Sequence, residues 1–214
     1  NWALMANVWC RYMMGKPLPE VLTYNRQHSE FIKRSTETIV SEAMKFQHRL
    51  ILCLQGETSD PLCLDGDSFS LQAWIDRAQA ADFHLLLNWY NVYMAELYFI
   101  HNEPKKALAY AIEAERTTEY NGGVFWGFSY VLLQALAITA QYTKMAEIPC
   151  EENKRLLRSL EQLKEWKQCF SPNFLQQHAL VAGECARLEG DYTSALNLFD
   201  AALRSANAGG YLQF

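Results

Sequence analysis

Glycine and proline are scarce in this sequence, and strand-like alternation of apolar and polar residues is nearly absent. The 214 residues include only 10 glycines and 6 prolines, most of which stand between apolar segments. A half-buried β-strand needs an apolar residue at every second position, whereas apolar residues here recur mostly at helical spacing. The sequence therefore argues against a β-sandwich or barrel and predicts an all-α fold.

A surplus of positive charge and a long apolar run are also lacking. The formal net charge is -5 at pH 7, whereas a general nucleic-acid binder would carry a clustered basic surface. No apolar run reaches the roughly 18 residues that a membrane span needs. The first residues, NWALMANVWCRYMMGK, lack the basic start and the cleavage site of a signal peptide. We therefore expect no nucleic-acid partner, no membrane partner and a cytoplasmic location.

Patterns that carry chemistry are missing as well. The six cysteines are scattered without a CxxC pair, so we expect reduced, buried thiols. No two histidines have the i, i+4 spacing of a helical metal site, and Asp65 and Asp67 do not fit a calcium loop. There is no GxxxxGK[ST] phosphate loop and no kinase catalytic loop. The sequence thus indicates no catalytic residue, no cofactor and no metal, and predicts that the protein is not an enzyme.

Apolar periodicity and turn residues predict ten helices in one domain, residues 1–214. Half of the residues are hydrophobic, enough for a sizeable core. The one long loop expected is 57–69, ETSDPLCLDGDSF, because of its proline, glycine and aspartates. The predicted helices cover about residues 1–14, 18–34, 36–55, 70–80, 82–101, 103–119, 123–143, 151–169, 174–189 and 191–207.

The segment ARLEGDYTSALNLFDAALRSA, residues 186–206, predicts a tight helical hairpin. Gly190 suits the left-handed conformation that ends a helix, and Asp191 can cap the next helix. Upstream, the small Gly183 would let the two helices approach closely. After the joint, apolar or small residues follow one helical face. They are Tyr192, Ala195, Leu196, Phe199, Ala202, Leu203 and Ala206.

This hairpin resembles the tetratricopeptide (TPR) repeat. That motif has a small residue in its first helix, here Gly183, and a Gly-Asp-Tyr-like turn, here residues 190–192. Its second helix carries alanine, a bulky aromatic and alanine at steps of four and three, here Ala195, Phe199 and Ala202. The resemblance implies antiparallel hairpins stacked as an α-solenoid with a right-handed superhelical twist.

Looser copies of the hairpin occur earlier in the chain. The turn at 102–104 is followed by Ala107, Ala111 and Ala114 at the same steps, and a poorer copy turns at Gly15. The three turns, at positions 15, 102 and 190, are 87 and 88 residues apart, and the landmarks Pro61-Leu62-Cys63 and Pro149-Cys150 keep a similar interval. These spacings suggest a super-repeat of four helices.

Four segments, in this order, resemble the TPR-like helical region of large multidomain signalling proteins: GKPLPEVL, LILCLQGETSDPLCLDGDSF, LYFIHNEPKKALAYAIEAE and NFLQQHALVAGECARLEGDYTSALNLFDAAL. In such proteins a serine/threonine-kinase-like domain and an AAA/STAND-type ATPase precede the helices, and GAF and histidine-kinase modules follow. The resemblance implies that this chain is part of a longer protein, in which it lies between an ATPase switch and an output module. It implies no catalytic residue in these 214 residues.

TPR-like stacks bind partners along the concave side, with the first helix of each hairpin. Glu96 and Glu184 occupy equivalent positions there, 88 residues apart, and could receive Lys or Arg of a peptide. The other reading is that both are ordinary exposed helix residues. The full set expected to line this partner-binding groove is Trp89, Glu96, Phe99, Gln177, Glu184 and Arg187.

Three functions compete on this basis. The first is a non-catalytic scaffold or sensor segment of a signalling ATPase or kinase, which binds a protein, a peptide or neighbouring domains of its own chain. The second is a stand-alone TPR adaptor that binds a peptide in its concave groove. The third, an all-helical enzyme, has no motif in its favour.

Overall fold

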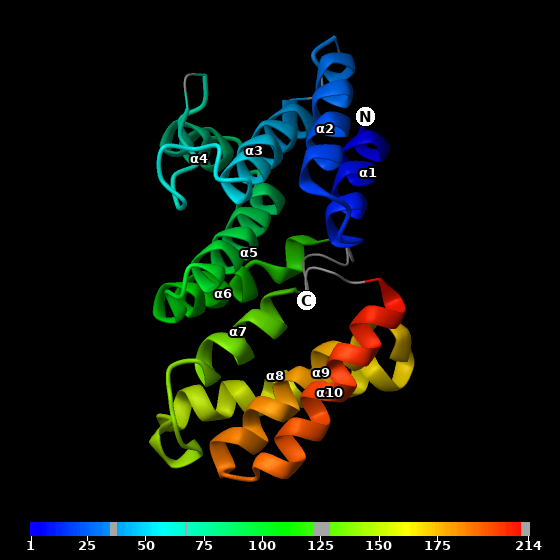
Figure 1. Ribbon diagram of the computed structural model, residues 1–214. Coiled ribbons are helices and arrows are strands. Elements are labelled where there is room, and N and C mark those ends of the chain that lie inside the picture. The colour runs from blue at the N-terminus through cyan, green and yellow to red at the C-terminus, as the bar shows by residue number, and fades with distance from the viewer. Residues whose placement is uncertain (35–37, 67, 122–128, 211–214) are drawn as a thin grey trace.

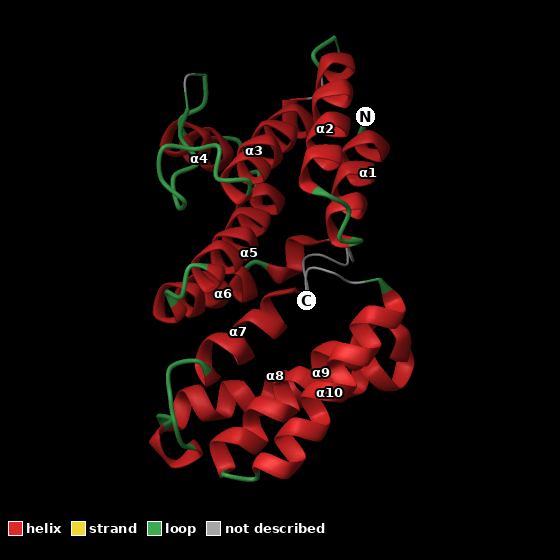
Figure 2. Ribbon diagram, in the orientation of Figure 1, coloured by secondary structure: helices red, strands yellow, loops and turns green. Residues whose placement is uncertain are grey.

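The computed structural model describes residues 1–34, 38–66, 68–121 and 129–210, and this part of the chain is helical without a strand. Its one β-type pairing is an isolated bridge between Gly66 and Phe69. The predicted all-α class is therefore confirmed (Figure 2). The α-helices are α1 Trp2–Met13, α2 Leu18–Ile32, α3 Thr38–Leu54, α4 Leu71–Ala80, α5 His84–Ile100, α6 Pro104–Arg116, α7 Ser129–Thr139, α8 Cys150–Cys169, α9 Ser171–Glu189 and α10 Tyr192–Gly209, with short 3-10 helices η1 Thr118–Asn121 and η3 Met145–Glu147.

Nine of the ten predicted helices match an observed one within a few residues at each end. The exception is the predicted helix 123–143, because α7 spans only Ser129–Thr139 and residues 122–128 lie outside the described part. The predicted loop 57–69 connects α3 to α4 as expected.

The helices follow a curved path from α1 and α2, through α5 and α6, to α9 and α10 (Figure 1). Helices α1, α3, α5, α7 and α9 form a continuous row, since each contacts the next member of the row. The even-numbered helices α2, α6, α8 and α10 pack beside their neighbours in this row, and α4 packs on α5. The helices thus pack mainly against helices that are near in sequence.

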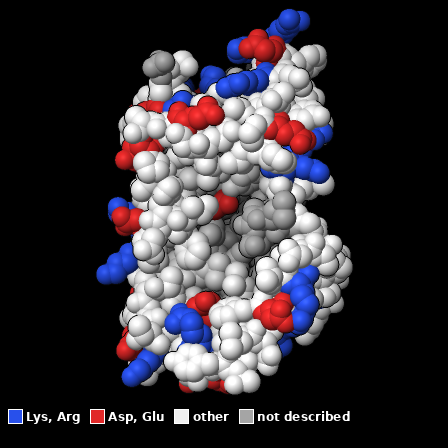
Figure 3. All heavy atoms as spheres, viewed as in Figure 1, with Lys and Arg blue, Asp and Glu red and all other residues white. Residues whose placement is uncertain are grey.

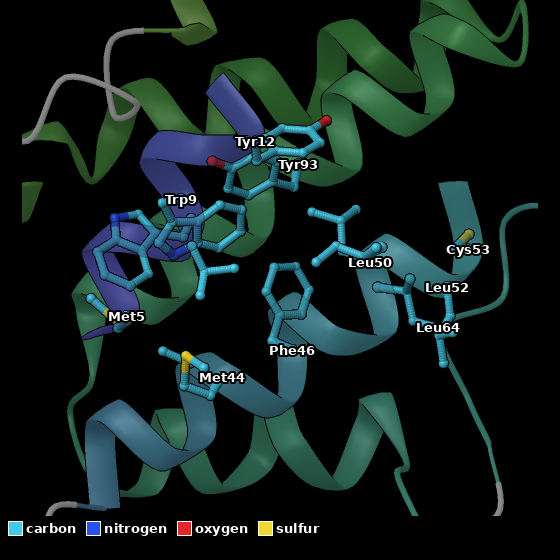
Figure 4. Close-up of a cluster of buried hydrophobic side chains, with 14 of the residues drawn as sticks. Met5, Trp9, Tyr12, Met44, Phe46, Leu50, Leu52, Cys53, Leu64 and Tyr93 are labelled. Carbon is cyan, nitrogen blue, oxygen red and sulfur yellow. The ribbon is translucent and has the colours of Figure 1, made fainter. Parts of the chain in front are cut away.

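Aromatic side chains hold the N-terminal half together (Figure 4). The rings of Trp9 on α1 and Tyr93 on α5 stack with centroids 4.3 Å apart. Phe46 on α3 stacks on Trp74 of α4 at 5.0 Å, and the Trp74 indole N–H donates to the backbone oxygen of Glu42 at 3.0 Å. Burying these large rings is the main stabilising contribution in this half. A second buried cluster joins α6, α7, α8 and α9.

The α9–α10 hairpin has the predicted joint. Gly190 has φ 85°, and the backbone N–H of Asp191 donates to the oxygen of Ala186 at 2.9 Å, which closes the end of α9. The Asp191 side chain accepts from the backbone N–H of Ser194 at 3.0 Å and caps α10. A Cβ atom at Gly183 would lie 2.7 Å from the Phe199 ring. The small residue and the aromatic residue of the predicted motif therefore face each other.

The two earlier turns share this joint, but the second pair of landmarks does not. Gly15 and Asn102 have φ 66° and 58°. At both turns the backbone N–H of the residue that follows donates to the backbone oxygen five positions earlier, as it does after Gly190. Pro61, however, lies inside the α3–α4 loop, whereas Pro149 directly precedes α8. The spacing of these two prolines is a coincidence in the sequence and does not mark equivalent places in the fold.

Candidate interaction surfaces

The six residues predicted to line a groove do not form one surface. Trp89 is 1% exposed and lies in the N-terminal core, edge-on to Trp9 with centroids 6.3 Å apart. We expected its ring to face a partner, and the structure places it between helices instead. Phe99 packs, partly buried, on the core between α5 and α7, and Gln177 is half-buried on α9.

Glu184 and Arg187 are already paired with each other on α9. The Arg187 Nε donates to the Glu184 carboxylate at 2.8 Å, and Nη2 donates to the backbone oxygen of Thr139 at 3.1 Å. This arginine therefore ties α9 to the C-terminal end of α7, where a cation is favourable. A peptide cation would have to displace Arg187 in order to reach Glu184.

Glu96 is the predicted groove residue that remains available to a partner. It lines a pocket of about 340 Å³ with Tyr12, Lys16 and Leu54. The Tyr12 hydroxyl donates to its Oε1 at 2.7 Å, and Ile100 adds an apolar wall. Burial raises the pKa of the Glu96 carboxyl to about 7, although the hydrogen bond from Tyr12 acts in the opposite direction.

The chemistry of this pocket favours a cationic group on an apolar stem. A partly buried carboxylate is destabilised in its charged form unless it is paired, and an ammonium or guanidinium group would pair with it. Binding would also release the proton that Glu96 holds near neutral pH. Tyr12 is 84 residues away from Glu96 in the sequence, so no local pattern could have identified this partner.

Helix α10 carries an exposed apolar row formed by Tyr192, Leu196 and Leu203, which are 68%, 69% and 60% exposed. The sequence placed the small and apolar residues of this helix on a single face. Only the alanines among them, such as Ala195 and Ala202, are buried against α9. Phe199 is partly buried and faces Gly183, whereas Tyr192, Leu196 and Leu203 form a second stripe that faces away, which no part of the described chain covers.

The equivalent stripe of α6 is covered by the helices that follow. Leu108, 88 positions before Leu196, is 7% exposed and belongs to the same buried cluster as residues of α7 and α8. Glu115, 88 positions before Leu203, accepts a hydrogen bond from Gln134 on α7 and pairs with Arg155 on α8. The α10 row thus has the pattern of a helix onto which a further helix can pack.

Charged side chains lie mainly around the edges of the face in Figure 3, while its hollowed middle is mostly uncharged.

No described helix could cross a membrane. In the described part of the chain, no three His, Cys, Asp or Glu residues gather as a metal site would need. All six cysteines are free, but only Cys53 and Cys185 are buried, so the expectation of buried thiols is wrong for the exposed Cys150 and Cys169.

Comparisons with protein-family models, with curated proteins and with solved structures found no match to this chain. Any function therefore has to be argued from the geometry given above.

Proposed function

We propose that the chain is a non-catalytic helical-repeat scaffold or sensor segment of a multidomain signal-transduction ATPase or kinase. In this proposal its hairpins form a right-handed solenoid, and the α10 row binds a helix of a neighbouring domain. The observation that carries the proposal is the exposure of Leu196 and Leu203, because the equivalent positions on α6 are covered.

The energy available at this row is sufficient for docking. Burying a leucine side chain contributes about 1.5–3 kcal/mol, and Tyr192, Leu196 and Leu203 lie at steps of four and seven on one side of the helix. A partner helix with small or apolar residues at similar steps, i, i+4 and i+11, would complement them. Association of this kind would pass a movement of one domain to the next through packed helices.

The test uses the longer protein that the proposal requires. Domains that flank the chain are expressed separately and their affinity for residues 1–214 is measured by calorimetry. We expect L196N combined with L203N to abolish binding. The matched control is L157N on α8, where Leu157 is 53% exposed but stands alone; this variant should bind normally.

Two results would contradict the proposal. One is normal binding by the double α10 variant. The other is a gene that encodes little beyond these 214 residues and has no phosphate-binding loop upstream.

A stand-alone adaptor is the second candidate, and the Glu96 pocket favours it. In that case Glu96 receives a lysine or arginine of a bound peptide. Peptide capture from a library should then be lost in E96Q and kept in E184Q, because Glu184 is held by Arg187. Trp89, although predicted to line the groove, cannot be used in this test, because Trp89→Ala would disrupt the core. Capture that both glutamate variants retain would exclude this pocket as the peptide site.

A further inference from the structure

A second pocket, of about 370 Å³, lies between α2, α3 and the α3–α4 loop. It is distinct from the α10 row and from the Glu96 pocket. Helix α2 contributes Asn25, Arg26 and Lys33, and helix α3 contributes His48 and Arg49. The volume is within the range of small-molecule sites. The pocket includes part of the loop that the sequence singled out and that the proposed function leaves unexplained.

Positive charge exceeds negative charge around this pocket. The described lining has four permanent cations, Arg26, Lys33, Lys45 and Arg49, and one carboxylate, Glu30. Glu30 pairs with Lys33 at 2.6 Å. Lys45 is paired outside the lining, with the carboxylate of Glu42. Two positive charges remain after both pairs are subtracted, in a protein whose formal net charge is -5. Such a local reversal of sign attracts anions.

The loop fixes one of these cations in place. The Arg49 Nε donates to the backbone oxygen of Leu64 at 2.6 Å, and its Nη2 donates to the backbone oxygen of Asp65. Gly66 makes room for the guanidinium, because a Cβ atom there would lie 2.5 Å from the Arg49 Cζ. The Asp65 side chain accepts from the backbone N–H of Leu71 at 2.6 Å at the start of α4. The Leu-Asp-Gly sequence of the loop therefore holds the guanidinium of Arg49, a residue that lines the pocket.

His48 adds a titratable donor. Its Nδ1 lies 3.2 Å from the Oδ1 of Asn25. The Asn25 amide group donates to Met44 and Gln47, so its Oδ1 is an acceptor and His48 Nδ1 carries the proton. Burial, together with the charges of Arg26 and Arg49, lowers the pKa of His48. An anion in the pocket would offset both positive charges and favour a second proton on the ring.

The remaining lining combines hydroxyl donors with an apolar surface. Ser29 and Ser68 supply hydroxyl groups, and Met44 and Phe69 supply apolar contact. Arginine and hydroxyl donors suit a phosphate, whose three terminal oxygens can accept several bonds at once. The apolar side chains suit a flat organic group attached to it. We propose that this pocket binds a small phosphate monoester that carries an aromatic or other apolar group.

Calorimetry with phenyl phosphate tests the proposal at constant, low salt. We expect the 214-residue protein to bind phenyl phosphate about tenfold or more tightly than benzoate, which has one negative charge, or inorganic phosphate, which lacks the ring. Arg26→Ala should weaken phenyl phosphate binding by about tenfold. Lys105→Ala is the matched control, because Lys105 is an exposed cation on α6 outside the pocket, and it should bind normally.

A second measurement uses the imidazole signals of His48 in nuclear magnetic resonance. Saturating phenyl phosphate should raise the pKa of His48, and the R26A variant should reduce this effect. Any one of three results would overturn the proposal. The protein could bind benzoate as tightly as phenyl phosphate, R26A and K105A could change phenyl phosphate binding equally, or the pKa of His48 could stay the same when phenyl phosphate binds. Circular dichroism verifies that R26A stays folded, as expected for an exposed side chain.

Discussion

The α5–α6 and α9–α10 hairpins have the same frame but differ in what surrounds them. Both turn through a left-handed residue, Asn102 in one and Gly190 in the other, 88 positions apart. The first hairpin lies in the middle of the molecule with helices on both sides, whereas the second has described helices on one side only (Figure 1). The same helical geometry is therefore compatible with a covered stripe on α6 and an exposed one on α10.

The two hairpins also fill the space between their helices differently. Gly183 faces the Phe199 ring in the second hairpin, whereas the equivalent positions in the first are Ala95 and Ala111, both fully buried in one cluster. One glycine and one large ring thus replace two alanines. The glycine makes room for the larger ring in the second hairpin, whereas two small side chains meet in the first, so the two hairpins fill this space with different volumes.

The largest difference should appear at the equivalent positions 89 and 177. Trp89→Ala removes a buried ring and should lower the free energy of unfolding by about 3–5 kcal/mol. Gln177→Ala replaces a half-buried polar residue and should change the free energy of unfolding by less than about 0.5 kcal/mol. Urea unfolding measures both values. Similar losses at the two positions would mean that the core does not centre on α5.

The next effect concerns Glu96, whose pKa is raised to about 7 by burial. The unfolded carboxyl titrates near 4.3, so between these values the folded state binds more protons than the unfolded state. The stabilisation is present below about pH 4.3 and is lost as the pH rises through 7, by roughly 3–4 kcal/mol in total.

Subtracting the unfolding free energy of E96Q from that of the wild type at each pH isolates this effect from other titrations. The difference should fall steadily from pH 4.5 to 7.5. Tyr12→Phe should extend the fall to higher pH, because the Tyr12 hydrogen bond is what lowers the pKa of Glu96. A flat difference curve would show that Glu96 is well solvated.

A double-mutant cycle tests the exchange of volume between the hairpins. Gly183→Ala alone should destabilise by about 1–3 kcal/mol through crowding with the Phe199 ring. Phe199→Ala alone leaves a gap. The double variant reproduces the Ala95 and Ala111 pair, so its loss should be smaller than the sum by about 0.5–3 kcal/mol. Simple additivity would mean that the two residues do not face each other.

The smallest of these effects is expected at the turns. Gly190→Val should cost about 1–2 kcal/mol, because φ 85° is unfavourable for a branched side chain. Gly190→Asn should cost less than half as much, since asparagine already adopts φ 58° at the equivalent Asn102. Thermal unfolding of the two variants compares them directly. An equal loss of stability in both would argue that the turns are not equivalent.

The sequence predicted local features well. Helical periodicity located the helices, and Gly190 and Asp191 identified the joint before α10, because both signals act within a few residues. Burial was harder to predict, since it depends on which helices come next. Trp89 was therefore expected in a groove although it lies in the core, and Leu196 was grouped on one face with alanines that are buried although it is exposed.

The candidate sites depend on contacts between distant segments. Tyr12 meets Glu96 across 84 positions, and the phosphate pocket forms only when α2, α3 and the loop come together. The 88-residue spacing pointed to Glu96 but not to its partner Tyr12, and no spacing in the sequence brings together the residues of the second pocket. Only the DGD segment of the loop gave a signal, and its glycine proved to make room for Arg49.

The most direct test of the central claim compares Leu108→Ala with Leu196→Ala, in residues 1–214 and in the longer protein that the proposed function requires. In residues 1–214, Leu108→Ala should cost about 2–5 kcal/mol and Leu196→Ala less than about 0.5 kcal/mol. In the longer protein, hydrogen exchange in α10 should show that Leu196→Ala lowers the free energy of opening by about 1.5 kcal/mol or more. An exchange rate in α10 that Leu196→Ala leaves unchanged in the longer protein would contradict the account.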